Sequence, residues 1–331
     1  MRRTSRTART PTNNPTARRH ASAAGAKKFG FHDSHDVRAC GRCDGFLLGD
    51  PAKPVELGIL NRDDGDRMNN LRSAPIGVAG GHLQAHTRLG GVPALVFLHY
   101  WGGSHRTFTP VIKAMTNDST AVTFDQRGWG EARTLPGPFG IHQLADDVIG
   151  VAGALGLERY VLVGHSMGAK VALLAASRRP VGLAGLVLIA PAPPKPTIDI
   201  ETARQRAHAY DDSAAVAATL ERALTYQALP TEIRQQVIED SLAADEEARR
   251  AWPLGGLLED ITHAVTTIDV PVLVIAGERD RVDPPTALQT NLLPYVPASR
   301  MTVLEATGHL SPLEVPLQIA TEIDRIVVEI K

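Results

Sequence analysis

Short apolar runs alternate with amphipathic segments from Ile76 to the C-terminus, and this alternation is the main structural signal of the sequence. Most of the runs are unbroken, which is typical of parallel strands that are covered on both faces. Residues 76–79 and 82–88 read as an opening hairpin joined by Gly80-Gly81. Further strands are expected at 95–98, 121–124, 160–163, 186–189, 272–275 and 301–304.

Helical periodicity is found between the expected strands and again after the last one. Apolar residues recur every three or four positions from Ile141 to Leu155, and again from Val315 to Ile330. Each pattern places one apolar stripe on a helix, which can then lie against a sheet. Strands that alternate with helices predict an α/β fold, with a doubly wound, mostly parallel sheet and right-handed crossovers.

About eighty residues without a good strand separate the runs at 186–189 and 272–275. A proline-rich exit leads into this interval, which is too long for a simple crossover. We expect a helical cap over residues 193–263, between core segments 68–192 and 264–331. The cap would cover the C-terminal edge of the sheet, where open α/β sheets bind ligands. Its helices are expected near 201–210, 213–228, 231–243 and 246–251.

The first 67 residues differ from the rest in composition, with thirteen basic and eight acidic side chains. Residues 1–32 have no acidic residue and no apolar periodicity, which predicts a disordered basic leader. No apolar run follows Arg2-Arg3, which argues against a signal peptide, while an arginine-rich start resembles a transit peptide. We hypothesise instead that translation starts at Met68. The intact mass of the native protein would refute this by showing residues 1–67 present.

Composition excludes several classes of protein. A hydrophobic fraction of 43% excludes a wholly disordered chain, and no apolar run approaches the roughly 20 residues of a membrane span. The body is mildly acidic and the leader lacks interleaved aromatic residues, so nucleic acid is not expected as a partner. Cys40 and Cys43 are the only cysteines, too few for a zinc ribbon, so we expect no metal and a cytoplasmic location.

The strongest chemical signal is Gly164-His165-Ser166-Met167-Gly168, between the strand at 160–163 and a helix-compatible segment. A serine between small residues at a sharp strand-to-helix turn is typical of a nucleophile elbow. The helix N-terminus offers backbone N–H groups to developing negative charge. The motif alone occurs often by chance, but its context makes Ser166 the candidate nucleophile.

A serine nucleophile needs a base, and the base needs an acid to orient it. After a strand–turn–helix elbow of this kind the three residues follow in the order Ser, Asp or Glu, and His, so the base comes last along the chain. His208, His263 and His309 follow Ser166. His208 belongs to the predicted cap and His263 precedes a core strand. His309 comes directly after the last strand, so we expect it to be the base.

The acid that orients the base should follow the preceding strand. Asp280 occupies the fourth position of a Gly-x-x-Asp turn there and is the candidate acid. Asp283 is the main alternative, but we expect it to cap the helix opened by Pro284-Pro285. Glu278 is a weaker alternative. If Asp283 and Glu278 are not the acid, each can also be interpreted as a solvated carboxylate of the loop.

Two backbone N–H donors are needed to bind an oxyanion. Met167, just after the nucleophile, supplies one, and Trp101 in the loop after the strand at 95–98 supplies the other. The side chains of Tyr100 and Trp101 could equally serve packing. We expect His99 to be a structural hydrogen-bonding residue rather than a second base.

Together, loop 99–103, turn 125–130, elbow 164–168, the Asp280 turn and Gly308-His309 resemble the α/β-hydrolase superfamily, in the branch with a helical cap. The resemblance runs from about Ile76 to the C-terminus and extends to esterases and cofactor-free haloperoxidases, which share a serine triad. Two positions depart from the family pattern. Tyr100 stands where family members usually have glycine, and Lys170 stands where small or apolar residues are common.

The sequence thus predicts a serine hydrolase that cleaves a small to medium carboxylic ester or lactone through an acyl-enzyme, without metal or cofactor. Perhydrolysis and carbon–carbon bond hydrolysis use the same triad and remain alternatives, as does a non-catalytic ligand-binding protein. A serine at position 166 argues against haloalkane and epoxide chemistry, which needs a carboxylate there. The partner is a small molecule, and the oligomeric state stays open. Candidate pocket residues are Tyr100, Phe108, Phe139, Tyr210, Tyr226 and Trp252.

Overall fold

The computed structural model describes residues 71–330. The predictions about the leader, the start at Met68 and the thiols of Cys40 and Cys43 lie outside these residues. Within them, no helix combines the length and the apolar character that crossing a bilayer requires.

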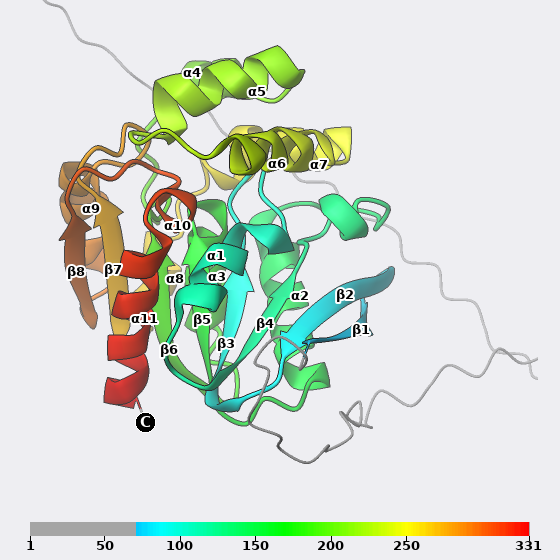
Figure 1. Ribbon diagram of the computed structural model, residues 1–331, viewed down its shortest axis with the longest axis vertical. Helices are drawn as coiled ribbons and strands as arrows, with labels where there is room; N and C mark the ends of the chain where they lie inside the picture. Colours follow the sequence, from blue (N-terminus) through cyan, green and yellow to red (C-terminus); the bar gives the residue numbers. More distant parts are fainter. Residues whose placement is uncertain (1–70, 331) are drawn as a thin grey trace, which may run out of the picture. The chain divides into compact units, whose positions relative to one another are not determined.

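The described residues form an eight-stranded sheet in the order β1-β2-β4-β3-β5-β6-β7-β8 (Figure 1). β1 pairs antiparallel with β2, and β2 pairs antiparallel with β4, while all other neighbours are parallel. This confirms the predicted mostly parallel sheet, including its opening hairpin. The strands are β1 Leu71–Val78, β2 Gly81–Arg88, β3 Gly91–Leu98, β4 Ser119–Phe124, β5 Tyr160–His165, β6 Leu183–Ile189, β7 Val272–Gly277 and β8 Ser299–Leu304.

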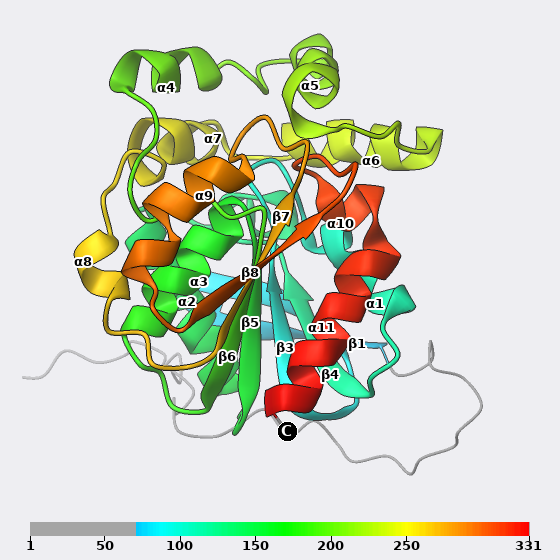
Figure 2. The same ribbon diagram turned by 90° about the vertical axis from the view of Figure 1, so that its left-hand side faces the viewer.

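Helices cover both faces of the sheet, which explains why the central strands are unbroken apolar runs. In β3, Val96 packs in the core cluster shared with α2, α3 and α8, whereas Leu95 and Phe97 pack with α1 and α11 on the opposite face. Figure 2 shows these two helical layers on either side of the sheet. Their bounds are α1 Thr109–Ala114, α2 Ile141–Ala154, α3 Met167–Ser177, α8 Thr262–Val265, α9 Pro285–Asn291, α10 Ser311–Glu314 and α11 Pro316–Ile330.

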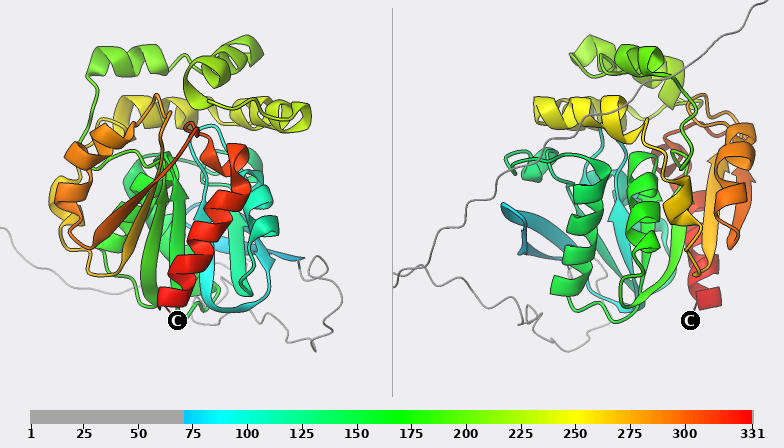
Figure 3. Two further views of the ribbon diagram at one scale, coloured as in Figure 1. Left: turned by 60° about the vertical axis from the view of Figure 1, so that its left-hand side comes forward. Right: turned by 180° about the vertical axis from the view of Figure 1, so that it is seen from behind.

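The long interval between β6 and β7 is helical. It contains α4 Ile200–Arg206, α5 Ser213–Thr219, α6 Thr231–Leu242 and α7 Glu246–Ala251, which we call the cap helices. Both views in Figure 3 show these helices, coloured light green to yellow, at one end of the sheet. Two short irregular helices, Leu220–Leu224 and Trp252–Gly256, extend α5 and α7. The remaining short helices are His105–Phe108, Gly130–Ala132 and Leu293–Tyr295.

Candidate active site

Ser166 occupies a strained turn between β5 and α3. Its backbone has φ 53° and ψ −111°, a conformation that L-residues rarely adopt and that is typical of functional turns. The flanking glycines make this turn possible. A Cβ atom at Gly168 would lie 2.2 Å from the carbonyl oxygen of Leu98, and one at Gly164 would lie 2.5 Å from the carbonyl oxygen of Gly168. Only glycine therefore fits at either position.

The structure brings Ser166, His309 and Asp280 together from three separate loops. The Ser166 hydroxyl lies 2.9 Å from His309 Nε2, and His309 Nδ1 lies 2.8 Å from Asp280 Oδ2. With Nδ1 protonated, His309 donates to the carboxylate and accepts from the serine. The other oxygen of Asp280 accepts the backbone N–H groups of Val282 (2.7 Å) and Asp283 (3.0 Å), which fixes the carboxylate.

Burial and neighbouring charges shift the pKa values of Asp280 and His309 in opposite directions. Burial favours a raised pKa for Asp280, but His309 and the two backbone donors outweigh it and hold the pKa below its usual value. Burial favours a lowered pKa for His309, but the charge of Asp280 and its hydrogen bond to the ring outweigh burial and raise the pKa. The geometry therefore stabilises an imidazolium at His309 beside an ionised Asp280.

His165 supports the loop that carries His309. Its Nε2–H donates to the backbone carbonyl of His309 over 2.9 Å, and the two rings lie 5.4 Å apart. Burial lowers the pKa of His165 to about 3, so this ring stays neutral. A neutral neighbour adds no positive charge that would oppose protonation of His309.

Asp283 does not cap α9, which corrects the expectation from the sequence. Pro284 occupies the N-cap position of α9, and no side chain caps that helix. Asp283 as a residue is 3% exposed, and its carboxyl group accepts no hydrogen bond from residues 71–330. Burial raises its pKa to about 7. Asp283 is thus a buried carboxyl group beside the candidate triad rather than a structural cap.

One candidate backbone donor, Trp101, lies in the loop after β3, and a second, Met167, begins α3 directly after Ser166. Among the described residues, none accepts a hydrogen bond from the backbone N–H of Trp101 or of Met167. His99 fixes the base of this loop, because its Nδ1 donates to the Tyr100 carbonyl (2.8 Å) and its Nε2 accepts from the Gln126 N–H (3.0 Å). With both ring nitrogens occupied, His99 has the structural role that we expect.

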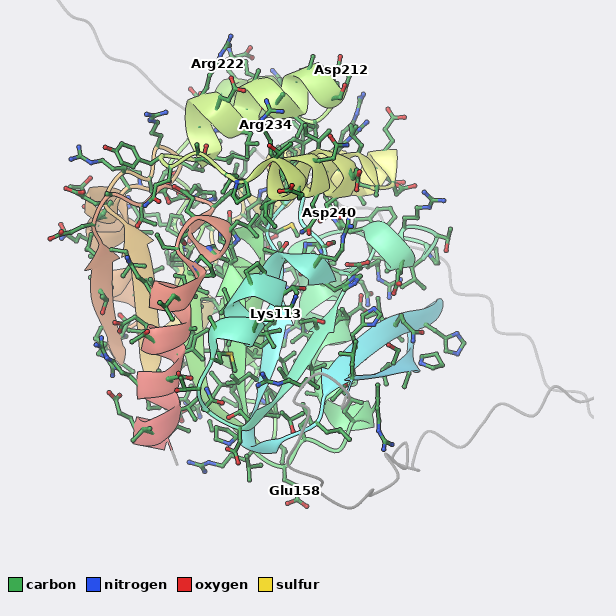
Figure 4. The ribbon with its side chains drawn as sticks, in the orientation of Figure 1. Lys113, Glu158, Asp212, Arg222, Arg234 and Asp240 are labelled. Carbon is green, nitrogen blue, oxygen red and sulfur yellow. The ribbon has the colours of Figure 1, made fainter. Side chains whose placement is uncertain are left out.

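The cap helices hold this loop from the other side. The Tyr210 hydroxyl donates to the Trp101 carbonyl over 3.0 Å, and the Ser241 hydroxyl donates to the Gly102 carbonyl over 3.0 Å. Asp240, labelled in Figure 4 where α6 faces the sheet, accepts from the Ser104 hydroxyl over 2.8 Å. Core and cap therefore share one hydrogen-bonded network around residues 101–104.

A cavity lies between the cap helices and the candidate triad, with Ser166 and His309 among its lining residues. Three of the aromatic residues proposed from the sequence, Tyr100, Tyr210 and Trp252, also line it. Small and apolar side chains form much of the remaining wall. These are Ala192, Ala209, Ala223, Leu224, Pro253, Leu257 and Val282.

Three other aromatic candidates do not line this cavity, and the sequence prediction is corrected for them. Phe108 is fully buried on the face of the sheet that α1 and α11 cover, where its ring centroid lies 4.9 Å from that of Phe97. Phe139 packs beside the backbone of Gly128. Tyr226 is 47% exposed and lies under the guanidinium of Arg279. Aromatic character alone could not distinguish these positions from the cavity wall.

Sequence analysis missed the charged part of the cavity wall. Arg206, Arg281 and Asp283 all line the cavity. It also missed Glu314, whose Oε2 accepts the backbone N–H groups of Gly308 and of two cap residues. Arg281 and Asp283 follow the recognisable turn that ends at Asp280, whereas no local pattern signalled Arg206 or Glu314.

Lys170 is a buried residue of α3, the helix that follows Ser166. Its Nζ donates to the carbonyl oxygen of Glu259 over 2.6 Å, and burial lowers its pKa to about 8. Lys170 is not among the residues that line the cavity. The side chain therefore joins α3 to the segment that follows the cap helices, a structural role.

Among residues 71–330, His86, His105 and Glu131 are the side chains grouped closely enough to hold a metal ion. Three of their four imidazole nitrogens are already engaged. His86 bonds Ser73 (2.8 Å) and Glu131 (2.9 Å), and His105 bonds Asp125 (3.1 Å). The group is not part of the cavity that contains Ser166, and we interpret it as a hydrogen-bonded network.

A family model described as "Alpha/beta hydrolase family" matches residues 95–322, which is more than half of the sequence. The chain belongs to the alpha/beta hydrolase family. This match begins within β3 and includes the elbow at Ser166, the cap helices and both Asp280 and His309.

Individual relatives match this chain at modest identity or over only part of its length. A candidate carbamate hydrolase, RutD, of Rhizobium rhizogenes is 39% identical over 89 residues, which are 27% of this chain and 34% of that protein. The 2-(acetamidomethylene)succinate hydrolase of Mesorhizobium japonicum is 27% identical over 211 residues, 60% of this chain and 75% of that protein. The first curated relatives are thus matched over about a third to two fifths of their length.

The fold itself is shared with solved structures. A thermophilic esterase from Thermogutta terrifontis superimposes with a TM-score of 0.67 and 23% identity, over 78% of this chain and 99% of the esterase. At this identity the likeness shows the fold alone.

Proposed function

We propose that this protein is a serine hydrolase that cleaves a small to medium carboxylic ester or lactone through an acyl-enzyme. The observation that carries the proposal is the unbroken chain of hydrogen bonds from Asp280 through His309 to Ser166, at the wall of a cavity. Membership in the alpha/beta hydrolase family supports it.

In the proposed mechanism, Ser166 Oγ attacks the carbonyl carbon of the substrate while His309 Nε2 takes the hydroxyl proton. Asp280 holds His309 in the required tautomer and stabilises the imidazolium that forms. The backbone N–H groups of Trp101 and Met167 bind the oxyanion of the tetrahedral intermediate. His309 then protonates the leaving alcohol, and water deprotonated by His309 cleaves the acyl-enzyme.

The cap helices have a defined part in this proposal. Residues 193–263 act as a cap over core segments 68–192 and 264–331, and their side chains complete the cavity wall opposite Ser166. Cap residues Tyr210 and Ser241 also hold the loop that supplies the first oxyanion donor. The small-molecule substrate therefore binds between cap and core.

A fluorophosphonate probe tests the nucleophile directly. We expect a mass adduct on the peptide that contains Ser166, and no adduct in the Ser166→Ala protein. p-Nitrophenyl esters of rising chain length and a set of lactones then test the reaction. Removing the nucleophile of a serine triad typically costs about 10⁶-fold in kcat, so Ser166→Ala should be inactive in this panel. An alanine variant that keeps every activity would exclude Ser166 as the nucleophile, whereas an unaltered protein with neither adduct nor turnover would leave a non-catalytic, ligand-binding role.

Two further assays separate the alternative reactions of the same three residues. Perhydrolysis would appear as peracid formation from an acyl ester with hydrogen peroxide, at a rate exceeding hydrolysis. Carbon–carbon bond hydrolysis would appear as cleavage of a vinylogous diketone. Ester or lactone cleavage faster than either, and dependent on Ser166, supports the proposed function over both.

A further inference from the structure

The polar side of the cavity differs from its apolar wall. Arg206, Arg281 and Asp283 are the charged side chains that line it besides His309. Arg281 is exposed, and its Nη1 donates to the backbone carbonyl of Arg222 over 3.0 Å. Arg206 and Asp283 are more buried, and their side chains make no hydrogen bond with residues 71–330, so we consider them as the groups through which the cavity recognises a polar substrate.

Arg206 presents a guanidinium group without a protein partner. It is the last residue of α4 and half-buried, and its side chain makes no hydrogen bond or ion pair with residues 71–330. It lies close enough to His309 and Asp283 to act on both electrostatically. By contrast, Arg204 on the same helix is exposed and paired with Glu201. The positive charge of Arg206 is thus directed to the cavity and uncompensated there.

Asp283 does not cancel this charge by an ion pair. No oxygen of its carboxyl group lies within ion-pair distance of Arg206. Burial raises the pKa of Asp283 to about 7, so near neutral pH a large fraction of this group is an uncharged acid. An uncharged acid can donate its O–H to a substrate oxygen, and it does not repel an anion. Positive charge therefore exceeds negative charge in the cavity.

We propose that the substrate carries a carboxylate group remote from its scissile carbonyl, and that Arg206 binds this carboxylate while Asp283 donates a hydrogen bond to it or to a neighbouring oxygen. A guanidinium presents paired donors that match the two oxygens of a carboxylate. The inference rests on the proposed function, because the same Ser166 performs the cleavage. It narrows the substrate class to half-esters of dicarboxylic acids and related carboxylate-bearing esters.

The test compares matched pairs of esters. Mono-p-nitrophenyl succinate, glutarate and adipate are each paired with the uncharged p-nitrophenyl ester of equal acyl carbon number, from butanoate to hexanoate. The Ser166→Ala protein gives the background of spontaneous hydrolysis, which includes attack by the substrate's own carboxylate. The readout is the ratio of kcat/KM within each pair, so changes that affect both esters cancel.

We expect the protein to prefer at least one half-ester about 10- to 100-fold, the range of a hydrogen bond to a charged group. Arg206→Gln should remove this preference, and Arg206→Lys, which keeps the charge but not the paired donors, should retain part of it. Arg204→Gln is the matched control on the same helix and should keep it entirely.

Asp283 provides a second, independent readout. As pH rises through about 7, its ionisation should weaken the preference for the half-ester, whereas Asp283→Asn should keep the preference at high pH. The groups that face Asp283 are His309, Asp280, Arg206 and Lys170. Titration of His309 changes the rate for both esters of a pair and leaves their ratio unaffected.

The outcomes separate this inference from the proposed function. Labelling of Ser166 and turnover of uncharged esters, with no preference for any half-ester, would overturn the inference alone. A preference that survives Arg206→Gln would also overturn it. Absence of both fluorophosphonate labelling and esterase activity would overturn the proposed function, and the inference with it.

Discussion

At the scale of single residues, the two glycines of the nucleophile turn carry the most stringent requirement. A methyl group at Gly168 would meet the backbone carbonyls of Leu98 and His99, neither of which can move without displacing the loop after β3. We therefore expect Gly168→Ala to cost about 3 kcal/mol or more in stability and to abolish esterase activity. Gly153→Ala is the control, because Gly153 lies in α2 with open space around it. That variant should gain about 0.5–1 kcal/mol. Urea unfolding of both proteins checks the contrast, and equal effects would contradict it.

The pH dependence of the reaction is also set by single residues. His309 must be uncharged to accept a proton, and its pKa is raised above 6.5. Activity should therefore fall as pH decreases through a value above 6.5. The charged or titratable groups facing His309 are Asp280, Asp283, Arg206 and His165. Asp280→Asn removes the largest opposing charge, so it should shift the acidic limb of kcat/KM to lower pH while lowering kcat about 10⁴-fold. An unshifted limb would exclude His309 as the titrating base.

Residues differ in how far sequence alone identifies them. Ser166 and His309 are recognisable because each stands at a fixed offset from the end of a predicted strand, where the order of the fold leaves few alternatives. Arg206 has no such offset, since its place in the cavity depends on how α4 is oriented over the sheet. The sequence predicts Asp283 as a helix N-cap because Pro284-Pro285 follows it. In the fold Asp283 does not cap α9 and is instead buried beside His309, which depends on tertiary contacts that the local sequence does not show.

At the scale of elements, Glu314 joins the loop of His309 to the cap. One carboxylate oxygen, Oε2, accepts the backbone N–H groups of Tyr226 (3.0 Å), Gln227 (2.8 Å) and Gly308 (3.1 Å). Glu314→Gln keeps the shape of the side chain but removes its charge. Because hydrogen bonds to a charged acceptor are about twice as strong as neutral ones, we expect a loss of about 1–3 kcal/mol in stability and a lower kcat. Thermal unfolding measures the change in stability, and esterase kinetics measure the change in kcat. Glu305→Gln is the control, because Glu305 is an exposed acid in the loop that carries His309.

The elements themselves followed from the sequence with small errors at their ends. The apolar runs at 95–98 and 160–163 lie inside β3 and β5, and the periodic segment from Ile141 matches α2. Burial on both faces makes such strands apolar throughout, so their pattern is strong. The segment at 213–228 was predicted as one helix, but α5 ends at Thr219 and an irregular helical turn follows. Packing of this turn against the cavity and the His309 loop, rather than local propensity, decides where the helix ends.

At the scale of the whole molecule, cap and core act as one unit around residues 101–104. The cap contributes the Tyr210 and Ser241 hydroxyl groups, and Trp101 Nε1 in turn donates to the cap carbonyl of Arg249 over 2.9 Å. Interlocked hydrogen bonds of this kind fix the backbone of the loop in position. A cap bound in this way also fixes the backbone that carries the Trp101 N–H.

This arrangement predicts that a cap residue affects the chemical step and not only substrate binding. Tyr210→Phe keeps the ring that lines the cavity but removes the hydrogen bond to the Trp101 carbonyl. Because a displaced oxyanion donor weakens transition-state stabilisation, kcat should fall about 3- to 10-fold with a smaller change in KM. Tyr226→Phe is the matched control, since this exposed cap tyrosine lies outside the cavity and should leave both constants unchanged. Steady-state kinetics on one p-nitrophenyl ester measure kcat and KM for both variants. A rise in KM at constant kcat would mean that the cap acts only as a wall of the binding site.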